Sequence, residues 1–104
     1  MASQNEARNE HDRMLAGELY DCGDPALLAR WHRAKDLTRA FAETASEDTA
    51  RKEALLRKLL GGFGEGLWIT PPFFVDYGEN IFFGDNCEVN LNCTFLDANV
   101  IRIG

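Results

Sequence analysis

Residues 81–104, IFFGDNCEVNLNCTFLDANVIRIG, carry the repeat that decides the fold of this 104-residue chain. An apolar residue recurs at every sixth position, at Phe83, Val89 and Phe95. A period of six fits neither an amphipathic helix nor a simple hairpin, and it is typical of a parallel β-helix whose three short faces close a triangular coil of about eighteen residues. We therefore predict that the chain ends in the first coil of such a β-helix.

Residues 89–95 alternate strictly between apolar and polar side chains. Since successive side chains of a strand point to opposite faces, one set is expected inside the coil and the other outside. The expected interior residues are Val89, Leu91, Cys93 and Phe95. Asn90 and Asn92 are expected to project outward together, either as a structural ladder or as part of a functional site.

The sequence before the repeat predicts three helices. A short first helix is expected from about Asn9 to Leu19. Asp24 followed by Pro25 is a helix start signal, an N-cap with proline at the first helical position, and it predicts a second helix that extends to about Thr44. Apolar or small side chains recur along it at spacings of three and four, namely Leu27, Leu28, Trp31, Ala34, Thr38 and Phe41.

Two signals compete for the start of the third helix. Thr44 and Glu47 have the spacing of a capping box, and Ser46 is an alternative N-cap. The expected apolar face consists of Leu55, Leu56, Leu59 and Leu60. The pair Gly61-Gly62 is expected to end the helix.

Short strands are expected after the helices. Residues 67–69 and 73–75 read as strands separated by a proline pair, and residues 77–80 read as a turn into the first hexad. The predicted fold class is α+β. We divide it into a polar tail at residues 1–13, a helical N-terminal domain at 14–62 and the start of a hexapeptide-repeat β-helix at 63–104.

The composition excludes several classes of partner. The chain is 45% hydrophobic and 27% charged, with a net charge of −6 and basic residues interspersed among acidic ones. This leaves no cationic patch for nucleic acid or for an anionic membrane. Residues 1–13 lack the apolar core of a signal peptide, and no apolar run approaches the length of a membrane span, so we expect a cytoplasmic protein.

The three cysteines, Cys22, Cys87 and Cys93, form no CxxC motif and have no neighbouring histidine that would complete a zinc site. Cys87 and Cys93 stand at equivalent hexad positions. A disulfide or a shared metal is one interpretation of that pair, and small packing residues at equivalent positions are the favoured one. We expect no metal site.

Three blocks of the sequence resemble the maltose and galactoside O-acetyltransferases of the hexapeptide-repeat superfamily. They are MLAGELYDCGDPALLARWHRAKDL at residues 14–37, GLWITPPFFVDYGENIFFGDN at 66–86 and NLNCTFLDANVIRIG at 90–104. The resemblance is to the N-terminal portion of that family. It implies a helical N-terminal domain, a left-handed parallel β-helix, homotrimers with active sites between subunits, and acetyl transfer from acetyl-CoA to a sugar hydroxyl such as one of maltose or glucose. Acetyl-CoA would be a co-substrate, with no bound cofactor.

The resemblance also assigns roles to three residues. Asp21 and Asp76 match acceptor-binding positions of the family, and Asn90 matches the asparagine that faces the acceptor and the transition state. Carboxylates can accept hydrogen bonds from sugar hydroxyls, and an amide can both donate and accept. An amide N–H beside the reacting carbonyl would stabilise developing negative charge by roughly 3 kcal/mol. Without the resemblance, Asp21 and Asp76 read as ordinary turn residues.

The chain departs from the family pattern in front of Asn90 and at Ala98. The family has aromatic and small residues at the first site, where this chain has Cys87, Glu88 and Val89, and the galactoside enzymes have a second acidic residue at the position of Ala98. These differences favour the maltose-like or general sugar branch. Asp97 also resembles a family position, and a role at a corner explains it equally well.

A general base is the missing part of the chemistry. A sugar hydroxyl needs one near neutral pH, and the family supplies a histidine from a later coil. The chain has two histidines, His11 and His32, and both precede the hexads. We expect both to be solvated surface residues, and the coils that would bind acetyl-CoA are not expected within these residues.

Three functions therefore remain open. The chain is an O-acetyltransferase or the N-terminal part of one, a non-catalytic module that binds sugars or oligomerises, or a helical interaction protein with a coincidental repeat. Because stacked repeats need about three units for stability, we expect a truncated product or a fragment that is inactive alone.

Overall fold

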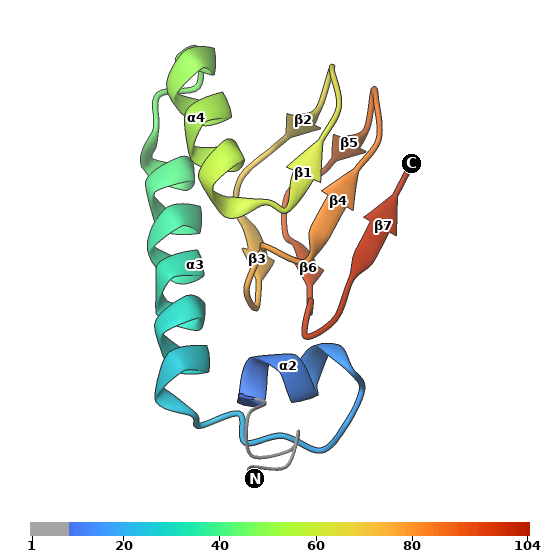
Figure 1. Cartoon of the computed structure of the whole chain (residues 1–104). Coiled ribbons are helices and arrows are strands. Elements are labelled where there is room, and N and C mark those ends of the chain that lie inside the picture. The colour runs from blue at the N-terminus through green and yellow to red at the C-terminus, as the bar shows by residue number, and fades with distance from the viewer. Residues whose placement is uncertain (1–8) are drawn as a thin grey trace, which may run out of the picture.

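The computed structural model describes residues 9–104, and among them three helices precede seven short strands (Figure 1). The helices are α2 (Glu10–Leu15), α3 (Pro25–Glu43) and α4 (Thr49–Leu59). The strands are β1 (Gly62–Phe63), β2 (Trp68–Ile69), β3 (Phe73–Val75), β4 (Ile81–Phe83), β5 (Glu88–Val89), β6 (Cys93–Phe95) and β7 (Ile101–Ile103). The predicted order of helices followed by short strands is confirmed. Residues 1–8 of the predicted tail lie outside the described residues.

The strands form three parallel ladders, β1-β4-β7, β2-β5 and β3-β6, so the chain winds as a coil with one ladder on each of three sides. Gly62 pairs with Phe82 and Phe73 pairs with Cys93, and every other pair has the same separation of 20 residues. The predicted parallel coil is present. Each turn takes 20 residues, more than the roughly eighteen predicted from the hexads.

The two additional residues fall at one corner of each turn. Ile69 and Val75 are both buried and stand six residues apart, and their partners Val89 and Phe95 repeat this spacing one turn later. Val75 and Phe83, however, are eight residues apart. The hexad period therefore describes two sides of the triangle and misses the longer corner at residues 76–80.

The coil has more turns than the single opening coil predicted from residues 81–104. Strands β1, β2 and β3 make a first turn, β4, β5 and β6 make a second, and β7 begins a third. Figure 1 shows β1, β4 and β7 side by side on one face. The expectation of a single opening coil was wrong because the glycines at residues 61–66 and the proline pair hide the first hexads.

Asp97 holds the longer corner together. Its side chain is 0% exposed, and its carboxylate accepts hydrogen bonds from Tyr77 N at 2.8 Å and from Asn80 N at 3.2 Å. Asn80 Nδ2 donates in return to the Asp97 carbonyl oxygen at 2.8 Å. A carboxylate of the second turn thus satisfies the backbone of the first, and the corner role considered for Asp97 is confirmed.

The predicted alternation of residues 89–95 stops at a corner between β5 and β6. Asn92 has a positive φ of 60°, and Asn92 N donates to Pro72 O at 2.7 Å. Leu91 is consequently 57% exposed, and its predicted interior location was wrong. Val89 is buried as predicted, and Asn90 is exposed as predicted.

The helices differ from the prediction at two boundaries. Helix α2 ends at Leu15, so Leu19 lies beyond it and is 97% exposed. The N-cap of α4 is Asp48, whose side chain accepts a hydrogen bond from Arg51 N, and neither Thr44 nor Ser46 has this role. Helix α3 has the predicted N-cap, since the Asp24 side chain accepts from the backbone N–H groups of residues 26 and 27.

Helix α4 ends before the glycine pair that was predicted to end it. The C-cap is Leu60 in an extended conformation, and Gly62 already belongs to β1. Positive-φ glycines occur elsewhere in the described chain, but Gly61 is not among them. Gly61 instead allows close approach, because a Cβ there would lie 2.5 Å from Glu79 O and 2.7 Å from the Phe82 ring.

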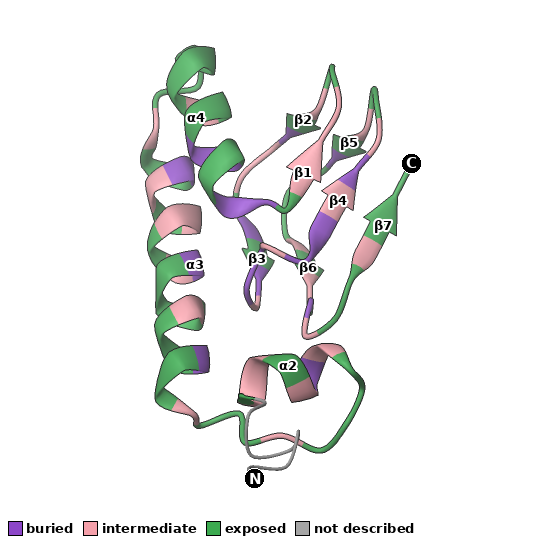
Figure 2. Ribbon diagram, in the orientation of Figure 1, coloured by how far each residue is buried: buried purple, intermediate pink, exposed green. Residues whose placement is uncertain are grey.

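Two clusters of buried residues join the helices to the coil. Figure 2 shows the buried positions of α3 and α4 on the sides that face the strands. In this main cluster, Phe41 of α3 meets Phe73 of β3 edge to face, with ring centroids 5.5 Å apart. The smaller cluster contains Met14, Leu27 and Tyr77, and it packs α2 and α3 against the longer corner.

Replacing Asp97 with alanine should lower the free energy of unfolding by about 3 kcal/mol, because two buried N–H groups lose their acceptor. Chemical denaturation followed by circular dichroism measures the change. Asp85→Ala is the matched control, since the exposed Asp85 Oδ1 accepts from Glu65 N at 2.8 Å across the turns. Asp85→Ala should lower the free energy of unfolding by less than about 1 kcal/mol. Equal decreases in the two variants would contradict the importance of the buried corner.

Gly61→Ala should also destabilise the fold, by about 1 to 3 kcal/mol, because the added methyl group overlaps the Glu79 carbonyl. Gly62→Ala is the neighbouring control, since the nearest atom to its Cβ would be a Phe82 ring carbon at 3.4 Å. Thermal unfolding of the two variants compares them directly. A larger decrease in unfolding temperature for Gly62→Ala would show that the close approach at Gly61 is unimportant.

Candidate functional site

A hollow of about 310 Å³ lies between the segment that follows α2, the first turns of α3 and the corner that follows β3. Aromatic and polar side chains line it together. They are Tyr20, Cys22, Leu28, Trp31, Asp76 and Tyr77. Since ligand sites favour clefts between structural units, with aromatic walls and a few polar groups, this hollow is the candidate functional site.

Three hydrogen bonds order the segment between α2 and α3, and one of them comes from the coil. Asn99 Nδ2, from the longer corner of the second turn, donates to Leu15 O at 3.0 Å. Asp21 N donates to Glu10 Oε2 at 2.8 Å, and Asp21 Oδ1 accepts from Gly23 N at 2.9 Å. These contacts place Tyr20 and Cys22 opposite the corner at residues 76–80.

Lys35 of α3 reaches the back of this corner. Its Nζ donates to the Val75 carbonyl oxygen and lies 4.4 Å from the centroid of a Trp31 ring. Burial lowers the pKa of Lys35 from its ordinary value of 10.5, and the carboxylates of Asp76 and Asp97 act in the opposite direction. The ammonium group is therefore a partly desolvated cation beside two carboxylates.

Tyr77 is the second ionisable group that the hollow perturbs. Burial raises the pKa of the Tyr77 phenol above 10.0, and smaller contributions from Tyr20, Asp76, Cys22 and Asp97 act in the same direction. The phenol thus stays protonated at neutral pH. Together with the Asp76 carboxylate it offers both a donor and an acceptor, which suits a ligand that carries several hydroxyl groups.

The structure separates the three residues assigned by resemblance. Asp76 lines the hollow, whereas Asp21 is exposed at its border and turns its carboxylate toward Gly23. Asn90 is exposed at the corner that precedes β6, and Asp76 follows β3. Because β3 and β6 are parallel partners, Asn90 and Asp76 lie at opposite ends of one side of the coil.

Four residues near the hollow were missed by the sequence reasoning: Tyr20, Trp31, Lys35 and Tyr77. Trp31 and Lys35 are one helical turn apart on α3, a spacing that places them on one face. Trp31 was assigned to the buried stripe of the helix, but it is 36% exposed. The available signal was the spacing of four residues between a tryptophan and a lysine on this helix.

The histidines lie on the helices. His32 is exposed, and its ring meets the Trp31 ring edge to face at 5.3 Å. His11 was expected in solvent, and this was wrong: His11 Nε2 is buried, has no hydrogen-bond partner among residues 9–104 and lies 3.5 Å from Glu79 Oε1. Glu79 also pairs with Arg30 at 2.6 Å, so this group attaches α2 and α3 to the longer corner.

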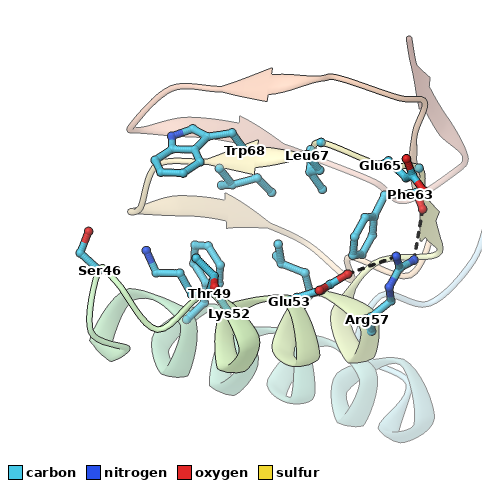
Figure 3. A pocket seen from close by; sticks show the side chains of 14 residues that line it. Ser46, Thr49, Lys52, Glu53, Arg57, Phe63, Glu65, Leu67 and Trp68 are labelled. Atoms are coloured by element: carbon cyan, nitrogen blue, oxygen red, sulfur yellow. Dashed lines mark hydrogen bonds and ion pairs between the residues drawn. The ribbon is translucent and has the colours of Figure 1, made fainter.

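A larger groove of about 400 Å³ lies between α4 and the first turn of the coil, and it contains none of the predicted site residues. Figure 3 shows Arg57 at one end of it, where its guanidinium group contacts Glu53 at 3.5 Å and Phe63 O at 3.1 Å. Its charged groups at that end are therefore already paired within the chain. The hollow at Asp76 remains the stronger candidate.

Other classes of site were searched among residues 9–104. No cluster of three or more histidine, cysteine or acidic side chains in this range could hold a metal ion, and the three cysteines are free. Cys87 and Cys93 are half-buried, which agrees with the packing interpretation. Within the same range, no helix has the length and apolar character needed to cross a membrane.

Comparison with known proteins gives a family and two close folds. The model of the maltose acetyltransferase hexapeptide capping motif matches residues 13–64. Nodulation protein L of Rhizobium meliloti (strain 1021) is 36% identical over 97 residues, which cover 93% of this chain and 53% of that protein. A maltose O-acetyltransferase from Clostridium difficile 630 has a crystal structure that aligns with a TM-score of 0.88 and 34% identity, covering 94% of this chain and 52% of that one.

A galactoside acetyltransferase in complex with coenzyme A aligns with a TM-score of 0.84 and 29% identity, covering 93% of this chain and 48% of that one. The resemblance stated from the sequence is confirmed by these matches. The chain spans about half the length of the relatives that it matches.

The surroundings of Lys35 can be tested by following its titration with NMR. The pKa of Lys35 should lie below 10.5, and Asp76→Asn should lower it further because the Asp76 carboxylate stabilises the ammonium group. Unfolding then takes up a proton between the two pKa values, so the contribution of Lys35 to stability should rise with pH in that window.

Asp36→Asn is the control for this titration, since Asp36 is exposed on the same helix and pairs with Arg39. It should leave the Lys35 midpoint in place. An identical Lys35 midpoint in the wild type and in Asp76→Asn would contradict the geometry of the hollow.

Proposed function

Because the chain belongs to the maltose acetyltransferase family of hexapeptide-repeat proteins, we propose that it forms the acceptor-binding part of an O-acetyltransferase. The acceptor would be a sugar hydroxyl, such as one of maltose or glucose, and the donor would be acetyl-CoA. The names of the relatives support both assignments, since one is a maltose O-acetyltransferase and another was solved in complex with coenzyme A.

The hollow at Asp76 is the observation that carries the proposal. It joins a carboxylate, a protonated phenol and an exposed indole between the capping helices and the coil. A sugar presents hydroxyl groups at its edge and carbon-bound hydrogens on its faces, so it can hydrogen-bond to Asp76 while it contacts Trp31. In this proposal Asp21 borders the entrance and binds the acceptor from its outer side.

Asn90 has a separate role in the proposal. It is exposed, and it lies far along the same side of the coil from Asp76. We assign its amide to the stabilisation of the transition state in a site that a neighbouring subunit completes, as the family resemblance implies for a homotrimer. The left-handed sense of the coil and the division at residues 14–62 and 63–104 belong to the same proposal.

Acetyl transfer needs a base that these 104 residues do not place in the coil. Both histidines are on helices, His11 beside Glu79 and His32 beside Trp31. We therefore propose that the chain by itself binds the acceptor and does not transfer acetyl groups. The three free thiols support a reducing compartment, which for this protein would be the cytoplasm.

Maltose should protect Cys22 from alkylation, because Cys22 lines the hollow and is exposed. At saturating maltose the rate of iodoacetamide labelling at Cys22 should fall about tenfold, while labelling of Cys87 and Cys93 stays unchanged, as mass spectrometry of the peptides can measure. Asp76→Asn should weaken maltose binding about tenfold, which corresponds to about 1.4 kcal/mol.

Asp36→Asn is the matched variant, since it makes the same chemical change at an exposed position of α3. It should bind maltose like the wild type. Calorimetry that detects no sugar binding would overturn the proposed function. Binding that leaves Cys22 fully reactive would place the acceptor elsewhere, and acetyl-CoA turnover by the isolated chain would disprove its inactivity.

A further inference from the structure

We infer that Lys35 is a positioning residue of the acceptor hollow, which sets the places of Asp76 and of the Trp31 ring through its charge and its hydrogen bond to Val75. The inference deepens the proposed function and rests on it for the identity of the ligand. Lys35 does not line the hollow itself, so it acts through its neighbours.

The contacts of Lys35 join the two structural units behind the hollow. Its Nζ donates to the carbonyl oxygen of Val75, the residue directly before Asp76, and lies 4.4 Å from a Trp31 ring centroid. Trp31 and Asp76 stand on different units, one on the capping helix α3 and one after strand β3. A single side chain thus links Trp31 to the residue directly before Asp76, and we expect Trp31 and Asp76 both to contact the acceptor.

The backbone around Asp76 is fixed by three contacts in sequence. Lys35 binds Val75 O, Phe95 O accepts from Asp76 N at 3.2 Å, and the Asp97 carboxylate accepts from Tyr77 N at 2.8 Å. The last two come from the second turn of the coil, and the first comes from α3. Lys35 therefore determines how the helical unit is placed against this corner.

The positive charge of Lys35 also affects the positions of the Asp76 carboxylate and the Trp31 ring. The carboxylates of Asp76 and Asp97 both favour its charged form, and burial disfavours it. Without the cation, two negative charges would remain close together at the corner and repel each other. The less buried carboxylate, that of Asp76, would then be the one free to move away from the hollow, and the Trp31 ring would lose the cation that lies over it.

Three substitutions separate these effects. Lys35→Met removes both the charge and the donor, Lys35→Gln keeps a donor without the charge, and Lys35→Arg keeps both. Lys58→Met is the matched control, because Lys58 is an exposed residue of α4 at a distance from the hollow. Each variant is prepared as the full chain, and thermal unfolding establishes that it folds.

The first readout needs no ligand. In ¹H–¹⁵N spectra, Lys35→Met and Lys35→Gln should shift the backbone amides of Asp76 and Tyr77 and the indole N–H of Trp31, while Lys35→Arg restores them toward the wild type. Lys58→Met should leave all three unchanged. Unchanged Asp76 and Trp31 signals in both Lys35→Met and Lys35→Gln would overturn the inference, whether or not a sugar binds.

The second readout is maltose affinity. Lys35→Met and Lys35→Gln should bind about tenfold more weakly than the wild type, and Lys35→Arg should recover to within about threefold. A merely structural lysine would lower the unfolding temperature of these variants and leave the affinity of the folded protein intact, and that result would overturn the inference. If the wild type binds no maltose, the proposed function fails, and the amide shifts still decide the role of Lys35.

Discussion

At the longer corner of the coil a carboxylate is held out of water, and the register of the turns depends on it. Burying an ionised group is costly unless hydrogen bonds and an opposite charge compensate for it. Asp97 accepts from Tyr77 N and Asn80 N, and the ammonium group of Lys35 is close enough to be affected by its charge. Because the donors belong to one turn and the acceptor to the next, this corner fixes both the 20-residue period and the location of Tyr77.

The helices α3 and α4 cover the apolar side of the first turn of the coil. The first turn has apolar side chains that its own strands do not cover, and α3 and α4 bury them, as Phe41 does when it packs on Phe73. The close approach at Gly61 lets the chain pass from α4 into β1 without a loop. The two units thus share a core, and the hollow lies between the helices and the corner that this core joins.

The sequence predicted elements with strong local signals and missed those set by distant contacts. Asp24 followed by Pro25 placed the start of α3 correctly, and the hexads at Phe83 and Val89 identified the inner face of the coil. The first turn and the longer corner depend on pairing 20 residues away and on a side chain from the following turn, which no local period contains. Leu91 was misplaced for the same reason, since alternation holds only within a strand.

In the candidate site, too, some residues could be predicted from the sequence and others only from distant contacts. Asp76 and Asn90 could be assigned because a resemblance transfers residue identities, but their separation along the coil follows from the parallel pairing of β3 with β6. Tyr20 lines the hollow because its segment is held by Asn99 of the coil, which bonds to Leu15 O across 84 residues, and by Glu10 of α2, which bonds to Asp21 N. A residue that lies behind a site, as Lys35 does, has no motif of its own, and only the three-dimensional contacts show that it links the helix to the corner.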